Sequence, residues 1–195
     1  MDSKINKIIL FTFIIFKVSF INSFAQSESN NLQKLVRLDI GLLGTWASYE
    51  HPIAAKWTLM TEVGANPVIF GGSLASKGFG VSGRVSFGTR YYYDRNIRIA
   101  KNMKIINNSG NFLQLIADYQ PSGFGYISVS DRSIIRELRF IPVWGGRRNI
   151  GSSRWSFESR IGIGYSYIIE DVETERTHNI AYDIRLVIGY TIFKK

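Results

Sequence analysis

SRWSFESRIGIGYSYII, residues 153–169, carries a large apolar side chain at almost every second position. This alternation is the period of a β-strand with two chemically different faces. Glu158, Arg160 and Gly162 lie on the second face. The apolar face holds Trp155, Phe157, Ile161, Ile163, Tyr165, Tyr167 and Ile169. Such a strand fits a water-soluble ring if its apolar face points inward, and a membrane-spanning ring if that face points outward.

The same alternation recurs along the rest of the chain. It predicts strands within 35–49, 56–66, 79–93, 111–119, 134–146 and 179–193. In the first of these segments, Val36, Leu38, Ile40, Leu42 and Trp46 share the apolar face, and Arg37, Asp39, Gly41 and Thr45 share the polar face. Regularly spaced hairpins of this kind are typical of an all-β barrel.

Seven clear strands are an odd number, whereas bacterial membrane barrels have even strand numbers. We assign the eighth strand to 124–130, after the turn signal Pro121-Ser122-Gly123. The alternative treats 120–134 as one long loop and places the extra strand near the N-terminus. Residues 94–104 are expected to hold a short amphipathic helix.

The N-terminus resembles a secretory signal. Lys4 and Lys7 precede an apolar run over 8–16, and Ser23-Phe24-Ala25 supplies the small residues of a cleavage site. We therefore expect a signal peptide over 1–25, a flexible lead over 26–34 and one barrel domain over 35–195. The absence of cysteine excludes disulfides, thiol chemistry and a lipoprotein anchor.

The polar faces decide which side of the strands is inside. They hold six arginines and six carboxylates, although the chain has a net charge of +9. Buried charges must be paired, and arginine pairs carboxylates in a bidentate way, so balanced charges and many glycines predict a narrow, filled interior. The predicted interior network is Arg37, Asp39, Glu62, Arg84, Arg90, Asp118, Glu137, Arg139, Glu158, Arg160, Asp183 and Arg185.

The apolar face is then expected to meet lipid, with aromatic residues near the strand ends as an interfacial girdle. The predicted girdle is Trp57, Tyr91, Tyr93, Trp155, Tyr165, Tyr167, Tyr190 and Phe193. A basic segment offers contacts to lipid phosphates through Arg95, Arg98, Lys101 and Lys104. These features predict an eight-stranded antiparallel up-and-down transmembrane β-barrel, with membrane lipids and lipopolysaccharide as partners and no nucleic acid.

Several stretches resemble a known family. SYEHPIAAKWTLMTEVGA (48–65), RYYYD (90–94) with SGNFL (109–113), and PVWGGRRNIGSSRWSFESRIGIGYSY (142–167) are similar to the small outer-membrane β-barrel proteins of Bacteroidota, which share the architecture of OmpA/OmpX-type barrels. The resemblance covers nearly all of the mature chain and implies fold and location rather than catalysis. Residues 190–193 also resemble the aromatic-ended last strand that the barrel assembly machinery recognises, although Lys194 and Lys195 follow here.

No stretch of the sequence carries a catalytic or cofactor signature, and we expect no cofactor and no metal. His51 and His178 lie in predicted turns without a paired serine, which favours solvated residues over a base–nucleophile pair. Gly44-Thr45-Trp46 matches the short lipocalin motif only weakly. The acidic stretch with Glu170, Asp171, Glu173 and Glu175 fits a solvated loop better than a cation site.

The expected function is therefore a non-enzymatic, monomeric outer-membrane protein with a plugged lumen and a structural or surface-interaction role. Two alternatives stay open. One is an enzyme that modifies outer-membrane lipids, and the other is a soluble exported lipid carrier of the lipocalin type.

Overall fold

The computed structural model describes residues 31–72, 75–128, 134–169 and 178–195. The strands are β1 (Leu35–Gly41), β2 (Gly44–Ala54), β3 (Trp57–Gly72), β4 (Ala75–Tyr91), β5 (Gly110–Gln120), β6 (Gly125–Ile127), β7 (Glu137–Asn149), β8 (Trp155–Ile168) and β9 (His178–Lys194). The α-helix α2 (Arg95–Ala100) and the 3₁₀ turn η1 (Ile106–Asn108) connect β4 to β5. None of the helices in these ranges is long and apolar enough to cross a membrane.

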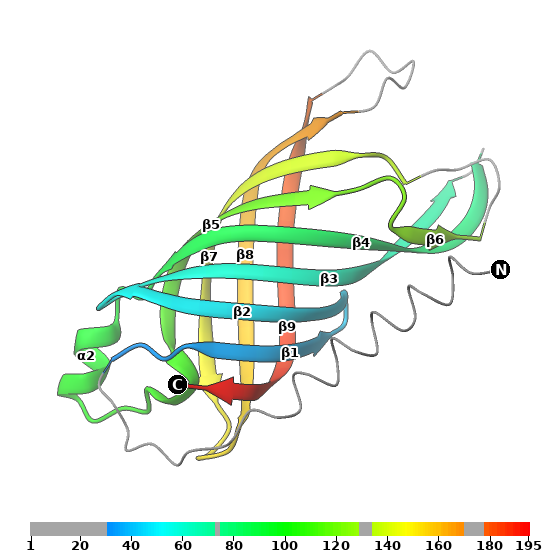
Figure 1. Cartoon of the computed structure of the whole chain (residues 1–195). Coiled ribbons are helices and arrows are strands. Elements are labelled where there is room, and N and C mark those ends of the chain that lie inside the picture. Colours follow the sequence, from blue (N-terminus) through cyan, green and yellow to red (C-terminus); the bar gives the residue numbers. More distant parts are fainter. Residues whose placement is uncertain (1–30, 73–74, 129–133, 170–177) are drawn as a thin grey trace, which may run out of the picture.

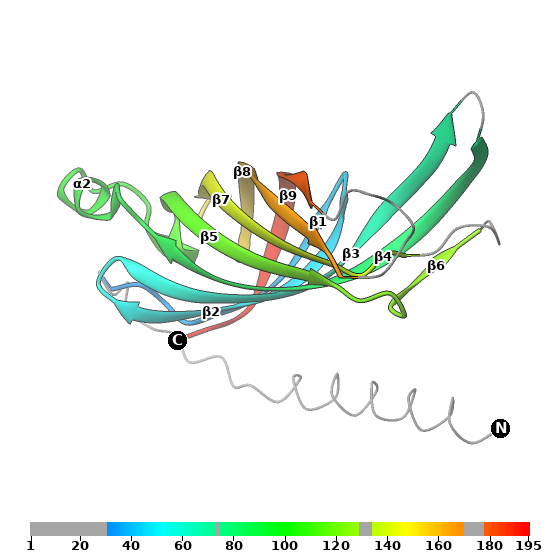
Figure 2. The ribbon, with the colours of Figure 1, turned by 90° about the horizontal axis from the view of Figure 1, so that it is seen from above.

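The nine strands in the described part of the chain belong to one sheet, and eight of them close into a ring (Figure 1). Neighbours along the ring are β1, β2, β3, β4, β5, β7, β8 and β9, and β9 pairs back with β1. Every pairing is antiparallel. The expected all-β, up-and-down ring of eight strands is therefore confirmed, and the view from above shows its strands curving around a common interior (Figure 2).

The eighth strand of the ring is not the one assigned from the sequence. The segment 35–49 is divided by a two-residue turn at Leu42 and Leu43 into β1 and β2. Gly44, whose φ is +136°, closes this hairpin in a backbone conformation that side-chain-bearing residues avoid. Because Leu42 and Leu43 are not typical turn residues, the sequence pattern predicts no turn here. The alternative with an extra strand near the N-terminus is therefore correct.

Residues 125–127 form β6 instead of a strand of the ring. β6 pairs with Gly80–Ser82 of β4, beyond the point at which β5 leaves that strand. β3 and β4 are the longest hairpin pair and extend past their neighbours, so β6 lies on a projecting hairpin (Figures 1 and 2). Residues 129 and 130 of the predicted strand lie outside the described residues.

The turn at 42–43 also changes which β2 side chains point inward. Antiparallel partners share a face, and the register pairs Asp39 with Trp46 and Ile40 with Thr45. Trp46 is buried inside the ring and Thr45 is exposed outside it, the reverse of the expectation from an unbroken strand.

The ring has two distinct ends. The chain enters β1 and leaves β9 at the end that also holds α2, here called the α2 end. The turn at 42–43, the β3–β4 hairpin tip and β6 lie at the other end, here called the hairpin end. Apart from the exposed Arg148, the arginines and carboxylates of the strands point into the ring. Most large apolar side chains point out, and a minority, among them Met60, Phe112 and Ile141, are buried inside.

Candidate functional site: the charged lumen and the two rims

The α2 end of the lumen holds a cluster of three arginines and three carboxylates. Glu158 on β8 accepts hydrogen bonds from Arg37, Arg90 and Arg147, at N···O distances of 3.2, 2.9 and 2.8 Å. Arg37 also pairs with Asp39 at 2.6 Å, and Arg147 pairs with Glu50 at 2.7 Å. These side chains come from β1, β2, β4, β7 and β8, so the cluster ties most of the ring together.

Two smaller clusters follow towards the hairpin end. In the middle, Glu62 accepts from Arg160 at 3.1 Å and from Arg185 at 3.0 Å, and Arg160 also pairs with Asp183 at 2.6 Å. The last cluster consists of Asp118, Glu137, Arg84 and Arg139. Arg84 bonds to Asp118 at 2.9 Å and to Glu137 at 3.2 Å, and Arg139 bonds to Asp118.

Each of the three clusters is electrically neutral, with three, two and two arginines matched by equal numbers of carboxylates. A single buried charge without a partner costs several kcal/mol, so neutrality is needed locally and not only over the whole lumen. The structure brings all twelve sequence-predicted charged residues into these clusters.

Glu50 and Arg147 were not in the predicted network. Both stand beside turn signals, His51-Pro52 and Gly145-Gly146, which shortened the predicted strands there. β2 and β7 run on to Ala54 and Asn149, which places both residues inside the ring. The alternation of β7, extended past the two glycines, places Arg147 on the same face as Glu137 and Arg139. For Glu50 the alternation is not enough, because only the turn at 42–43 brings the even-numbered residues of β2 inside the ring.

Small residues make room for these large side chains. A Cβ atom at Gly189 would lie 1.9 Å from Oδ1 of Asp39 and 2.1 Å from Nη2 of Arg37. A Cβ at Gly64 would lie 2.1 Å from the Trp46 ring, over which Arg185 stacks at 4.0 Å. The cavity left at the centre of the lumen measures about 10 Å³, enough for about one water.

The connection between β4 and β5 closes the α2 end of the lumen. Asn107 and Asn108 are fully buried there, with positive φ angles of 52° and 54°. Asn108 exchanges two hydrogen bonds with the backbone of Gln33, at 2.7 and 2.8 Å, and Asn107 donates to Asn149 at 2.6 Å. Residues 31–34 of the predicted flexible lead are therefore held against the ring.

Tyr92 joins this closure to the charged cluster. Its hydroxyl donates to Oε1 of Glu50 at 2.7 Å, and its ring packs edge-on against Phe112. Burial raises the pKa of Tyr92 above the ordinary value, so the hydroxyl stays protonated and remains a donor.

The predicted girdle residues fall at the two ends of the outer face. At the α2 end, Trp57 packs against Tyr91 with 4.8 Å between the ring centroids, and Trp155 packs edge-on against Tyr190 with 5.0 Å between theirs. Tyr93 accepts a hydrogen bond from Nε1 of Trp144 at 2.9 Å, which adds a tryptophan that the sequence had placed only on the apolar face.

Phe193, near the end of β9, belongs to this group by position. At the hairpin end, Tyr165 and Tyr167 flank His178, with both ring centroids 5.4 Å from the imidazole.

Two of the four predicted lipid-phosphate contacts are corrected by the structure. Arg95 and Arg98 are buried, because their guanidinium groups bond backbone carbonyls within the closure. Arg95 donates to the carbonyls of Ile105 and Asn31, and Arg98 donates to that of Lys104. Only Lys101 and Lys104 of this set are exposed.

The histidines lie in strands rather than in turns. His51 is near the end of β2 at the α2 end, and His178 begins β9 at the hairpin end. Each contacts a tyrosine hydroxyl through Nδ1, Tyr49 for His51 and Tyr165 for His178. Within the described ranges there is no group of three or more metal-ligating side chains, and the acidic stretch 170–175 lies outside them.

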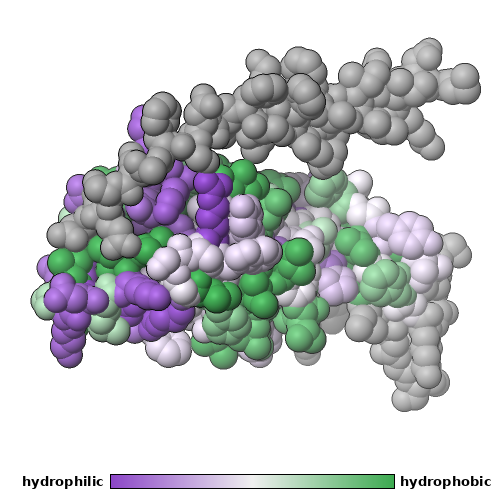
Figure 3. Space-filling model, turned by 90° about the horizontal axis from the view of Figure 1, so that it is seen from below, coloured by the Kyte–Doolittle hydropathy of each residue, from purple (hydrophilic) through white to green (hydrophobic). Residues whose placement is uncertain are grey.

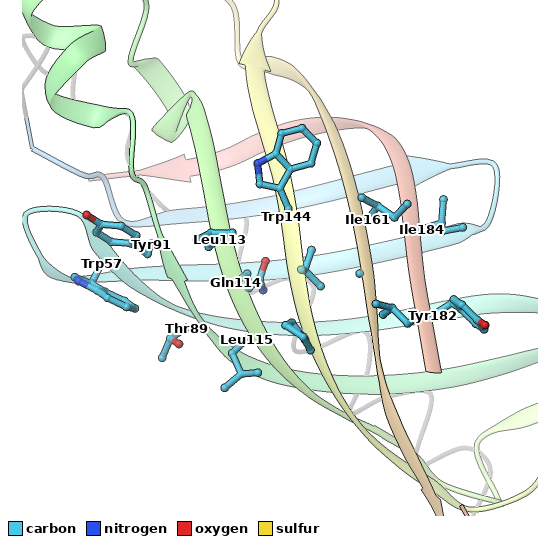
Figure 4. Close-up of a pocket in the computed structure, with 14 residues that line it drawn as sticks. Trp57, Thr89, Tyr91, Leu113, Gln114, Leu115, Trp144, Ile161, Tyr182 and Ile184 are labelled. Atoms are coloured by element: carbon cyan, nitrogen blue, oxygen red, sulfur yellow. The ribbon is translucent and has the colours of Figure 1, made fainter. Parts of the chain in front are cut away.

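The outer face is hollowed from the start of β3 across β4, β5, β7, β8 and β9 (Figure 4). The hollow has a volume of about 860 Å³ and is bordered by apolar side chains, including Trp57, Leu113, Trp144 and Ile184. A smaller pocket of about 220 Å³ lies at the hairpin end, between Gln120, Glu137 and Ile168.

The fold and the lumen define a class, an all-β ring of eight antiparallel strands with a filled, ion-paired interior. Comparisons with protein-family models, curated proteins and solved structures give no match to this chain.

Proposed function

We propose that this protein is a small, non-enzymatic outer-membrane barrel with a plugged lumen, which acts through the loops at its hairpin end in a structural or surface-interaction role. One observation carries the proposal: the ring is inverted relative to a water-soluble protein. Arg37 and Arg90 are fully buried inside it, whereas Ile163 and Ile180 are 58% and 64% exposed outside it. An outer face covered by exposed apolar side chains favours lipid over water as its surroundings.

The height of the apolar band supports the same setting. Trp155 and Tyr167 stand near the two ends of β8, 12 residues apart. At about 3.3 Å per residue this separation is about 40 Å, and at a strand tilt of about 40° its vertical component is about 30 Å. That height is close to the hydrocarbon thickness of a bilayer, about 30 Å. Hydrophobic side chains occupy the middle of the surface in Figure 3, and hydrophilic ones gather towards its left side.

The filled lumen argues against a lipid carrier and a wide channel. A carrier needs an interior cavity of several hundred Å³, and the central cavity here is about 10 Å³. The positions of the histidines argue against a lipid-modifying enzyme. His51 and His178 stand at opposite ends, each beside a tyrosine. We expect His51→Ala and His178→Ala to leave the acyl composition of membrane lipids unchanged.

The absence of cysteine permits a direct test of the membrane arrangement. Single cysteines at Leu42, in the hairpin-end turn, and at Lys56, in an α2-end turn, should react with an impermeant maleimide from opposite sides of the bilayer. Membrane fractionation and gels of boiled and unboiled sample complete the test, because a folded membrane barrel migrates differently when unboiled. Recovery in the soluble fraction, with no shift on boiling, would overturn the proposal.

A further inference from the structure

The α2 end carries a rim of cationic side chains from separate elements. It consists of Lys34, Lys56, Lys101, Lys104, Arg148 and Lys194, here called the basic rim. These residues come from the lead, the β2–β3 turn, the connection after α2, and the ends of β7 and β9. They therefore surround the end of the ring and do not converge on one point.

No exposed carboxylate side chain balances the basic rim in the described ranges. Of the eight acidic residues there, seven belong to the lumen clusters. The eighth, Asp94, is buried; it accepts a hydrogen bond from the backbone N–H of Asn111 and lies 3.8 Å from Arg98. The lumen is neutral, so the excess positive charge of this end faces outward.

The basic rim lies just beyond the aromatic residues of the same end. Lys56 precedes Trp57, and Lys194 follows Phe193. The connection after β4 also exposes Ile97 and Met103 next to Lys101 and Lys104. Along the axis of the ring, the apolar band is therefore followed by the girdle of aromatic residues and then by the cations. A lipid leaflet has its layers in the same order: the hydrocarbon core, the interface and the headgroup phosphates.

We propose that the basic rim binds the headgroup phosphates of anionic phospholipids in the leaflet at the α2 end. This inference rests on the proposed function, because it needs the ring to span a bilayer. Phospholipid is favoured over lipopolysaccharide for two reasons. The cations are spread around the ring, which suits several singly charged headgroups better than one multiply phosphorylated glycolipid. The second reason is the side of the membrane. The β3–β4 hairpin projects beyond the ring at the hairpin end, as extracellular loops do, whereas at the α2 end 55–56 and 150–154 are short and 92–109 folds against the lumen. This assigns the α2 end to the periplasmic side, where the leaflet is phospholipid.

The test uses the folded full chain in phosphatidylcholine vesicles with a trace of spin-labelled lipid. The relative association constant of the wild-type protein for spin-labelled phosphatidylglycerol should be about three- to five-fold that for spin-labelled phosphatidylcholine at low salt. The preference should shrink in about 0.5 M salt, because exposed charges are screened. The variant K56Q/K101Q/K104Q/K194Q should lower the ratio to about one. The matched control K77Q/R136Q, at the hairpin end, should keep it.

Three results would overturn the inference. The first is an unchanged preference in the rim variant, and the second is a preference that salt leaves intact in wild type, a measurement that does not depend on folding of a variant. The third is a rim variant that loses binding of lipopolysaccharide in mixed vesicles but keeps that of phosphatidylglycerol. A chain that labels from both sides of the bilayer and shifts on boiling, yet lacks the lipid preference, refutes this inference alone and leaves the proposed function standing.

Discussion

Arg147 on β7 and Glu50 on β2 form an ion pair across the lumen, with 2.7 Å between Nη1 and Oε2. Both side chains are 1% exposed. Arg147 also bonds Glu158 and the backbone carbonyl of Asn107. One guanidinium thus links the charged cluster to the segment that closes the α2 end.

Arg147→Leu should lower the free energy of unfolding by about 3–5 kcal/mol, because Glu50 and Glu158 keep their buried charges while losing a shared partner. Urea unfolding of the folded protein in vesicles measures the loss. Arg148→Leu is the matched control: Arg148 follows directly on the same strand but is exposed, and its replacement should cost under about 1 kcal/mol. Equal losses in the two variants would contradict the assignment of Arg147 to a buried pair.

Arg160→Leu should also destabilise the ring, although leucine adds apolar surface. Arg160 pairs with Glu62 and Asp183, and its removal leaves those carboxylates with Arg185 alone in their cluster. We expect a loss of about 3–5 kcal/mol, with partial recovery in R160L/E62Q, where charge balance returns. The temperature at which the unboiled form disappears from gels reports both changes. A double variant no more stable than R160L would show that neutrality of the cluster is not the cause.

Gly189→Ala tests the space beside the Arg37–Asp39 pair. The added Cβ would overlap both side chains, so we expect a loss of about 1–3 kcal/mol in urea unfolding. Gly123→Ala is the control, because a Cβ there meets no atom within 4 Å. If the two substitutions cost the same, the lumen is less tightly filled than its geometry indicates.

Tyr92→Phe should change the pH dependence of stability at alkaline pH. The folded state binds the Tyr92 proton more tightly than the unfolded state, because burial raises the pKa. This contribution is fully present below about pH 10 and declines as the pH rises above that value. The variant should therefore lose about 1–2 kcal/mol at pH 7, from the hydrogen bond to Glu50, and show a shallower decline above pH 10. An alkaline decline as steep in Tyr92→Phe as in wild type would contradict this role of the buried hydroxyl.

Local alternation was enough to predict most of the strands and their two faces. Glu158, Arg160 and Gly162 face inward and Ile161 and Ile163 face outward, as the pattern of 153–169 requires once the inside is chosen. The prediction failed where the backbone reverses without a polar signal. The tight turn at Leu42 and Leu43 divides one predicted strand into two and turns Trp46 inward.

The burial of Arg95 and Arg98 could not be predicted from the sequence, for a different reason. A basic, amphipathic stretch has the same composition whether its guanidinium groups meet phosphates or backbone carbonyls. Their position is set by the folding of 92–109 over the α2 end and by contact with Asn31, 64 residues away from Arg95.

The sequence by itself determined that strands alternate between a charged face and an apolar face, because side-chain direction follows the two-residue period of extended backbone. It also determined that the predicted charged face holds equal numbers of arginines and carboxylates. Only the tertiary structure decided which carboxylate meets which arginine, because these pairs join strands that are up to 123 residues apart in the chain. The separation into three neutral clusters depends on the register and closure of the ring, which no single strand specifies.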